Sequence, residues 1–136
     1  MGFVSRLETD AVVIESNAKT GTSEQTNLIL HSLKHALLNA APAVTGLTQD
    51  EFGANLDLEN RELLLYDNRP GGTGGCRLLA DRRLLRWLNV ARELAECHQV
   101  QCAGACRACL FLPTRLCRQG NLSLDRQRVL QLIPQD

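Results

Sequence analysis

The chain has 136 residues, of which 44% are apolar and only 4% aromatic, so leucine must fill most of the modest core that this length allows. Fifteen basic and fifteen acidic residues balance, which excludes a globally basic nucleic-acid binder and leaves only local patches for such contacts. No apolar run is long enough to cross a bilayer, and the N-terminal residues lack the apolar segment of a signal peptide. We therefore expect a cytoplasmic protein whose six cysteines are reduced or bound to metal.

The first half of the chain predicts a strand, a helix and a hairpin. Residues 7–16 are rich in β-branched side chains and predict a strand. Ser23 is a suitable N-cap for a helix that ends at Pro42, and its core positions at helical spacing are Leu30, Leu33, Leu37 and Ala40 or Ala41. Strands over 47–56 and 61–66 follow, with Asp57 and Asn60 at the turn between them.

The second half predicts a glycine loop, a long helix over 76–96, a cysteine knuckle over about 97–117 and a short helix over 123–133. Ser123 is the expected N-cap of this last helix, and Asp125 is expected in its first turn. The element order predicts one α+β domain over residues 1–136, with a short antiparallel sheet, two main helices, a zinc knuckle and a C-terminal helix.

Five cysteines fall within 21 residues, which is typical of a metal knuckle. The core spacing is Cys102-x3-Cys106-x2-Cys109, and the residues Ala-Gly-Ala inside it let the backbone fold tightly around an ion. Zinc needs four ligands in a tetrahedron, so a fourth must come from Cys97, Cys117 or His98. An iron–sulfur cluster is the rival metal centre, and buried or redox-active thiols are the metal-free alternative. Four protein ligands leave no open position, so the sequence predicts a structural zinc.

Three motifs in order carry a family resemblance: YDNRPGGTGGC before a helix, then C-x3-C-x2-CL, then N-x-x-LDR. Together they resemble the zinc-binding C-terminal domain of mitomycin-repair-type (MrfA-like) helicases, which also occurs in the DISARM anti-phage component that accompanies a helicase. The matching positions are Tyr66, Asp67, Pro70, Gly71, Gly72, Gly74, Cys102, Cys106, Cys109, Leu110, Asn121, Leu124, Asp125 and Arg126.

The chain departs from the family pattern in two ways. Family members often carry C-x-C at the start of the knuckle, whereas Val100 stands here and the nearest upstream cysteine is Cys97. We take Cys97 as the fourth ligand and Cys117 as the alternative. The chain also lacks a Walker A motif and any helicase motif, so we expect either a stand-alone subunit or a domain excised from a longer, helicase-related chain.

The glycine loop permits two interpretations. It could simply turn the chain tightly, or its N–H groups could hold phosphate at a helix N-terminus. Arg82, Arg83 and Arg86 fall on the opposite side of the predicted helix from Leu84, Leu85 and Leu88. They form either an ordinary solvated face or a surface for DNA backbone or an acidic partner. The candidate nucleic-acid or partner contacts are Arg69, Gly71, Gly72, Gly74, Arg77, Arg82, Arg83 and Arg86, and the knuckle adds Arg107, Arg115 and Arg118.

His31 and His35 are spaced i, i+4 and could present two metal ligands on one helix face. No Glu or Cys completes a set, so we expect surface or partly buried histidines. Trp87 is expected to pack on a neighbouring element.

The sequence thus predicts a non-catalytic, Zn²⁺-binding accessory module of a DNA helicase or translocase, in DNA repair or anti-phage defence. A protein-only scaffold is the alternative, and a redox thiol enzyme is the third. No catalytic residue is assigned, and the expected partners are the motor subunit and the DNA backbone, with no membrane.

Overall fold

The computed structural model describes most of the chain: residues 3–8, 11–16, 23–57, 59–69, 72–81, 83–113, 116–117, 120–121 and 124–133, without the side chains of Phe3–Glu8, Ser16, Ser23 and Glu24. Over these residues no helix has the length and apolarity needed to span a membrane. The positions Pro70, Gly71, Arg82, Arg115, Arg118 and Ser123, which the sequence analysis singled out, lie outside the described residues.

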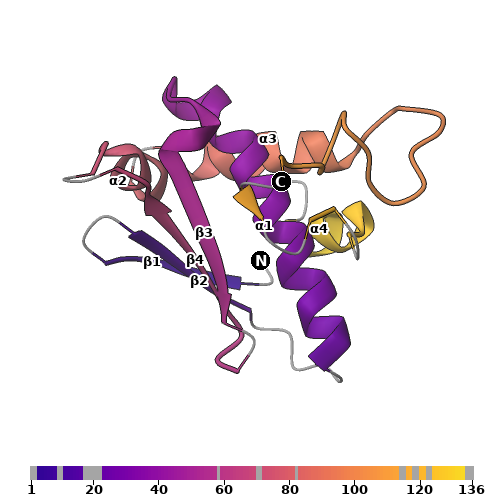
Figure 1. Ribbon diagram of the computed structural model, residues 1–136, viewed down its shortest axis with the longest axis horizontal. Helices are drawn as coiled ribbons and strands as arrows, with labels where there is room; N and C mark the ends of the chain where they lie inside the picture. The colour runs from indigo at the N-terminus through magenta and orange to yellow at the C-terminus, as the bar shows by residue number, and fades with distance from the viewer. Residues whose placement is uncertain are drawn as a thin grey trace.

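Within the described residues, four strands and four α-helices make a mixed α+β fold, which confirms the predicted class (Figure 1). In chain order the elements are β1 (Phe3–Glu8), β2 (Ala11–Ser16), α1 (Ser23–Thr45), the 3₁₀ helix η1 (Gln49–Glu51), β3 (Phe52–Asp57), β4 (Glu62–Asp67), α2 (Gly75–Ala80), α3 (Leu84–Ala95) and α4 (Arg126–Leu132). The strands form one antiparallel sheet in the order β1-β2-β4-β3. The predicted strand over 7–16 is therefore a hairpin of two strands.

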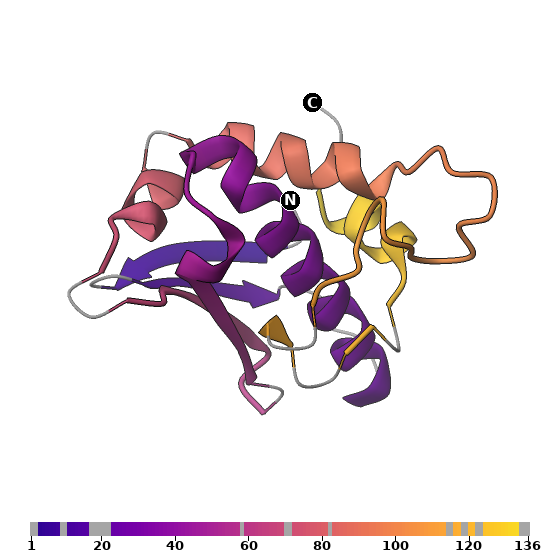
Figure 2. The same cartoon turned by 45° about the horizontal axis from the view of Figure 1, so that its top comes forward.

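Helix α1 lies between the sheet on one side and α3 and α4 on the other, while α2 packs at the end of the sheet. The cysteine-rich segment between α3 and α4 extends away from the sheet in both ribbon views (Figures 1 and 2). The metal knuckle is thus held by helices rather than by the sheet.

The core is built from alternating sheet positions and one face of α1. Leu63 and Leu65 of β4 and Val12 and Ile14 of β2 are fully buried, as expected where one sheet face is covered by a helix. The predicted core positions of α1, including Leu30, are fully buried too. Because α1 is covered on several sides, most of its second half is inaccessible to solvent.

Trp87 fixes α3 onto α1. Its ring is fully buried, and its indole Nε1 donates a hydrogen bond of 2.9 Å to the Leu37 carbonyl. The prediction that Trp87 packs on a neighbouring element is confirmed. Burying an aromatic ring of this size while satisfying its N–H stabilises the contact between the two helices.

Pro42 does not end α1, so that prediction is wrong. The helix continues to Thr45, the Gly46 N–H bonds the Pro42 carbonyl at 2.9 Å, and Gly46 has a φ of +79° that only glycine adopts readily. Proline removes one backbone hydrogen bond. The burial of Val44 in the last turn favours continuing the helix despite that cost.

The predicted helix over 76–96 is two helices. The chain leaves helical geometry at Asp81, with φ −100° and ψ −87°, and α3 begins only after Arg83. This break changes the helical phase, and Trp87, Leu88, Ala91 and Ala95 now face the core. Leu85 lies about 200° round the helix from Trp87 and is 64% exposed, so it does not share the buried side of Leu88 on which the sequence analysis placed it.

The last helix is shorter than predicted. It begins at Arg126 and its N-cap is Asp125, whose carboxylate accepts a hydrogen bond of 3.0 Å from the Gln127 N–H. The predicted helix start is therefore wrong by two positions, because Asp125 is the N-cap and not a residue of the first turn. The predicted turn between the last two strands is confirmed, because Asp57 Oδ1 accepts from the Asn60 N–H at 3.1 Å.

Candidate metal centre

Four cysteines from the knuckle bring their sulfur atoms together. Cys97, Cys102, Cys106 and Cys109 have all four Sγ atoms within 4.8 Å of one another. The separations are 3.6 Å for Cys97–Cys106, 3.8 Å for Cys102–Cys109 and 3.9 Å for Cys106–Cys109. None of these cysteines is in a disulfide. We call this group the four-cysteine cage.

The cage has the size of a zinc site. Zinc–sulfur bonds of about 2.3 Å in a tetrahedron place neighbouring sulfurs about 3.8 Å apart. The three separations above bracket that value. The residues present therefore fit a zinc ion with four thiolate ligands, and such a site is closed to water and substrate.

Local turns place the thiols. Cys97 follows the end of α3, with its N–H bonded to the Leu94 carbonyl at 3.2 Å. A tight turn joins Cys106 and Cys109, in which the Cys106 N–H donates to the Cys109 Sγ at 3.3 Å and the Cys109 N–H donates to the Cys106 carbonyl at 3.1 Å. The N–H···S bond holds the Cys109 sulfur toward the cage, in the way that outer hydrogen bonds orient metal ligands.

Four clustered thiols do not ionise together unaided. Burial raises the pKa of Cys109 to about 12, and burial also raises the pKa of Cys106. Burial opposes ionisation of Cys102 as well, but the Gly104 N–H and the neighbouring thiols outweigh it and lower the pKa of Cys102 to about 7. A bound metal deprotonates its thiol ligands, so zinc binding here releases protons and weakens as the pH falls.

Residues of the third family motif attach the cage to the helices. The Arg126 N–H donates to the Gly104 carbonyl inside the knuckle at 2.8 Å, and its guanidinium Nη1 donates to the Ala95 carbonyl at the end of α3 at 3.2 Å. Asn121 holds the segment that follows the knuckle. Its side-chain Oδ1 accepts from the Leu112 N–H, and its Nδ2 donates to the Leu112 carbonyl. The knuckle is thus joined to both the end of α3 and the start of α4.

Cys117, the alternative fourth ligand, is not part of the cage. It lies with His31 and His35 of α1, and one ligand atom of each residue lies within 4.8 Å of the other two. Both histidines are buried, at 1% and 0% exposure, so the expectation of surface or partly buried rings is wrong. Their i, i+4 spacing was the sequence signal, but its third member lies more than 80 residues away and could not be recognised from spacing.

The glycine loop is held by Asp67. Its carboxylate accepts hydrogen bonds of 3.0 Å from the N–H groups of Thr73, Gly74 and Cys76. Burial opposes ionisation of Asp67, but these donors outweigh it and lower the pKa of this carboxyl. The Gly72 N–H bonds the Arg69 carbonyl, and the Gly75 N–H bonds the Thr73 hydroxyl.

The N–H groups of residues 72–76 therefore all have partners within the chain. This favours the structural interpretation of the loop over phosphate binding by Gly72 and Gly74. Gly72 and Gly74 have φ angles of +76° and +82°, which explains glycine at these two positions.

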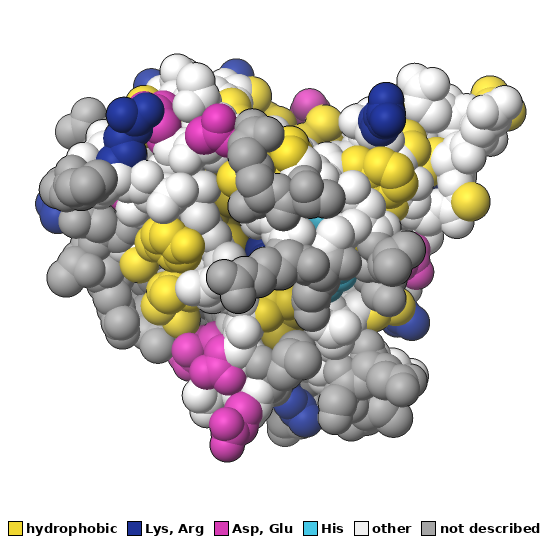
Figure 3. Space-filling model, in the orientation of Figure 1, with side chains coloured by type: hydrophobic (Ala, Val, Ile, Leu, Met, Phe, Trp, Pro, Cys, Tyr) yellow, Lys and Arg dark blue, Asp and Glu magenta, His cyan; other side chains and the backbone are white. Residues whose placement is uncertain are grey.

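The candidate arginines differ in their contacts with the rest of the fold. Arg83 is exposed, but its Nη1 donates to the Val44 carbonyl at 2.6 Å and so caps the end of α1. Arg69 pairs with Glu51 at 3.3 Å. Arg77, Arg86 and Arg107 are exposed. On the face in Figure 3, basic side chains are scattered among acidic ones and do not gather in one patch.

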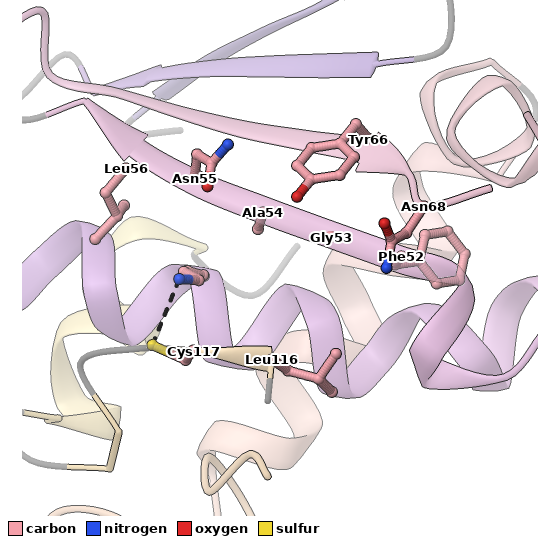
Figure 4. A pocket seen from close by; sticks show the side chains of 10 residues that line it. Phe52, Gly53, Ala54, Asn55, Leu56, Tyr66, Asn68, Leu116 and Cys117 are labelled. Carbon is pink, nitrogen blue, oxygen red and sulfur yellow. Dashed lines mark hydrogen bonds between the residues drawn. The ribbon is translucent and has the colours of Figure 1, made fainter. Parts of the chain in front are cut away.

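A hollow of about 520 Å³ lies between β3, α1 and the segment of Leu116 and Cys117 (Figure 4). Lys34 of α1 lines it and donates to the Cys117 sulfur at 3.4 Å. Tyr66 and Asn68 add polar groups to the lining. The sequence analysis did not anticipate this feature.

The comparisons with known proteins agree with this geometry. Residues 33–110 match the family described as MrfA Zn-binding domain. The crystal structure of the DUF1998 helicase MrfA bound to DNA matches with a TM-score of 0.72 and 18% identity, over 90% of this chain. The chain spans only 16% of the length of that protein. The search of curated proteins gave no match.

The fold and the four-cysteine cage define a zinc-binding domain. Because the family match covers more than half of the chain, the chain belongs to the MrfA Zn-binding domain family, and its cofactor is zinc. The predicted resemblance and the predicted metal are confirmed.

Proposed function

We propose that this chain is a non-catalytic zinc module of a DNA helicase or translocase, working in DNA repair or anti-phage defence in a reducing, cytoplasmic setting. The main observation that supports this proposal is the closed four-cysteine cage in a domain of the MrfA Zn-binding family. Cys97, Cys102, Cys106 and Cys109 hold the zinc. A closed cage has no position for a reacting water, which supports a structural role.

The zinc holds the knuckle as a rigid arm between α3 and α4. Exposed arginines on α2, α3 and the knuckle contact the DNA backbone, the motor, or both; they are Arg77, Arg86 and Arg107. Such contacts are electrostatic and therefore weaken with salt.

The ligand set is tested by zinc content. Cys97→Ser is expected to lower zinc affinity strongly at the cage, because it leaves three thiolates. Cys76→Ala is the matched control, since Cys76 is a buried cysteine that lies outside the four-cysteine cage and outside the group of His31, His35 and Cys117. Equal zinc affinity in Cys97→Ser and the wild type would remove Cys97 from the ligand set.

DNA contact is tested by fluorescence anisotropy of labelled single- and double-stranded DNA with the zinc-loaded chain at several salt concentrations. The double variant Arg77→Ala/Arg86→Ala is expected to weaken binding and to reduce the slope of log affinity against log salt by up to about 2. Arg128→Ala, on α4 and outside the proposed contacts, serves as the control and is expected to leave binding nearly unchanged. Arg83 is left intact because it caps α1.

A protein-only scaffold is the second candidate. Leu85 on α3 and Val100 at the knuckle are large apolar side chains exposed at 64% and 99%. Such residues suit a protein partner better than a phosphate backbone. No DNA binding at low salt, together with capture of a motor subunit that Leu85→Ser and Val100→Ser abolish, would favour this candidate.

A further inference from the structure

The four-cysteine cage leaves a second group of potential ligands unused. In the middle of α1, His31, Ser32, Lys34 and His35 are all buried, with exposures between 0% and 6%. The buried Ser32 hydroxyl has a hydrogen-bond partner, because it accepts from the Asp125 N–H at 2.8 Å. The two histidines and the lysine instead meet Cys117, from the other end of the chain.

The geometry of this group suits a metal ion. His31 Nε2 lies 3.3 Å from the Cys117 Sγ, and the two imidazole rings are 4.5 Å apart with an angle of 88° between their planes. Zinc bonded tetrahedrally to imidazole and thiolate separates nitrogen and sulfur by about 3.6 Å. One ligand atom of each of the three residues lies within 4.8 Å of the others, so a small movement encloses an ion.

The hydrogen bonding of His35 gives independent support. Its Nδ1 donates to the Leu110 carbonyl at 2.7 Å, which leaves Nε2 as the nitrogen with the lone pair. That Nε2 is buried and has no hydrogen-bond partner among the described residues. Metal-binding histidines are commonly held in this way, with one ring N–H on a backbone carbonyl and the other nitrogen free to ligate.

We propose that His31, His35 and Cys117 form a second divalent metal site that takes zinc. Three protein ligands leave a fourth position, which differs from the closed four-cysteine cage. Cys117 and Lys34 line the hollow in Figure 4, so water there supplies the fourth ligand. Lys34 Nζ donates to the Cys117 sulfur at 3.4 Å and orients the thiolate as an outer-shell partner.

The competing account is a metal-free cluster in which the Cys117 sulfur is hydrogen-bonded to Lys34 Nζ and His31 Nε2. The two accounts differ in zinc content and in the atoms bonded to zinc. Zinc content is measured by inductively coupled plasma mass spectrometry on the full, zinc-loaded chain after dialysis, and ligand type by zinc X-ray absorption. We expect two zinc ions per chain and a clear imidazole contribution, which a cage of four thiolates cannot give.

Two variants localise the second ion. His35→Asn keeps an amide donor for the Leu110 carbonyl but removes the ring nitrogen lone pair, and Cys117→Ser replaces the thiolate by a weak ligand. Each is expected to hold one zinc with sulfur ligands only. Two variants should keep both ions: Cys76→Ala, which removes a buried thiol elsewhere, and His98→Ala, which removes the exposed imidazole beside Cys97.

A wild-type chain with one zinc and sulfur scattering alone would overturn the proposal, and so would two zinc ions retained in both His35→Asn and Cys117→Ser. If these variants do not fold, as judged by circular dichroism, the wild-type metal count and imidazole signal decide. Zinc in the four-cysteine cage gives an X-ray absorption signal from sulfur ligands only. A chain that lacks the second zinc can therefore be distinguished from a chain that lacks the zinc of the cage.

Discussion

At the scale of single residues, Asp67 is the organising group of the glycine loop. It accepts three backbone N–H bonds of 3.0 Å, and hydrogen bonds to an ionised carboxylate are among the strong ones. Asp67→Asn keeps one acceptor oxygen and turns an NH₂ group toward N–H donors. We expect a loss of about 1–3 kcal/mol in unfolding free energy at pH 7, measured by urea denaturation.

The same carboxylate gives a pH dependence. The donors lower its pKa below the ordinary 3.8, so the native state binds fewer protons than the unfolded state at acid pH. The stabilisation is fully present above pH 3.8 and is lost as the pH falls through the lowered pKa. Asp67→Asn should remove this acid-sensitive part of the stability. Asp57→Asn, whose carboxylate serves only the local turn, should leave the glycine loop unaffected.

Two arginines near the start of α3 should behave differently. Both residues are exposed, but Arg83 donates a hydrogen bond to the Val44 carbonyl at the end of α1. Arg83→Ala is expected to destabilise the fold by about 1–2 kcal/mol, and Arg86→Ala by less than about 0.5 kcal/mol. Thermal unfolding of both variants checks this, and equal midpoints would show that the Arg83 cap contributes nothing.

At the scale of elements, Gly75 allows α2 to pack against the sheet. A Cβ at this position would lie 2.8 Å from atoms of the Phe52 ring and the Leu47 side chain. Gly75→Ala is therefore expected to cost about 1–3 kcal/mol by overpacking. Gly104→Ala is the control, because its Cβ would meet only the Leu124 carbonyl oxygen, at 3.4 Å. Chemical denaturation of the two variants compares them directly.

At the scale of the whole molecule, zinc joins the knuckle to the core. Cys109, Leu110 and Leu112 belong to the same hydrophobic cluster as Trp87 and α4 residues such as Val129. Removing zinc with a strong chelator should therefore lower the stability by about 3 kcal/mol or more. Hydrogen exchange should rise first in the knuckle and α4, while the sheet and the Trp87 contact stay protected.

Acid should reproduce the effect of the chelator. Protons compete with zinc for the cage thiolates, so zinc release should increase as the pH falls and reverse on neutralisation. A colorimetric zinc indicator follows the release. Stability and hydrogen exchange that do not change after complete zinc removal would contradict a structural role for the cage.

Local spacing predicted much of the fold and of the first site. The Cys102, Cys106 and Cys109 spacing predicted the knuckle because ligands of one ion must lie on one tight turn, and Cys97 is near enough to join them. The α+β class followed from strand and helix patterns. Helix boundaries at Pro42 and Arg83 were missed, because burial of Val44 and the capping of α1 by Arg83 depend on the packed structure.

The sequence by itself determined that this is an α+β zinc-binding domain, since periodicity and ligand spacing are properties of neighbouring residues. Only the tertiary structure decided that Asp67 occupies the loop N–H groups, that Arg83 caps the end of α1 and that Cys117 leaves the cage for His31 and His35. These contacts join residues six to more than eighty positions apart, and packing of α1 between the sheet and the other helices brings the most distant of them together.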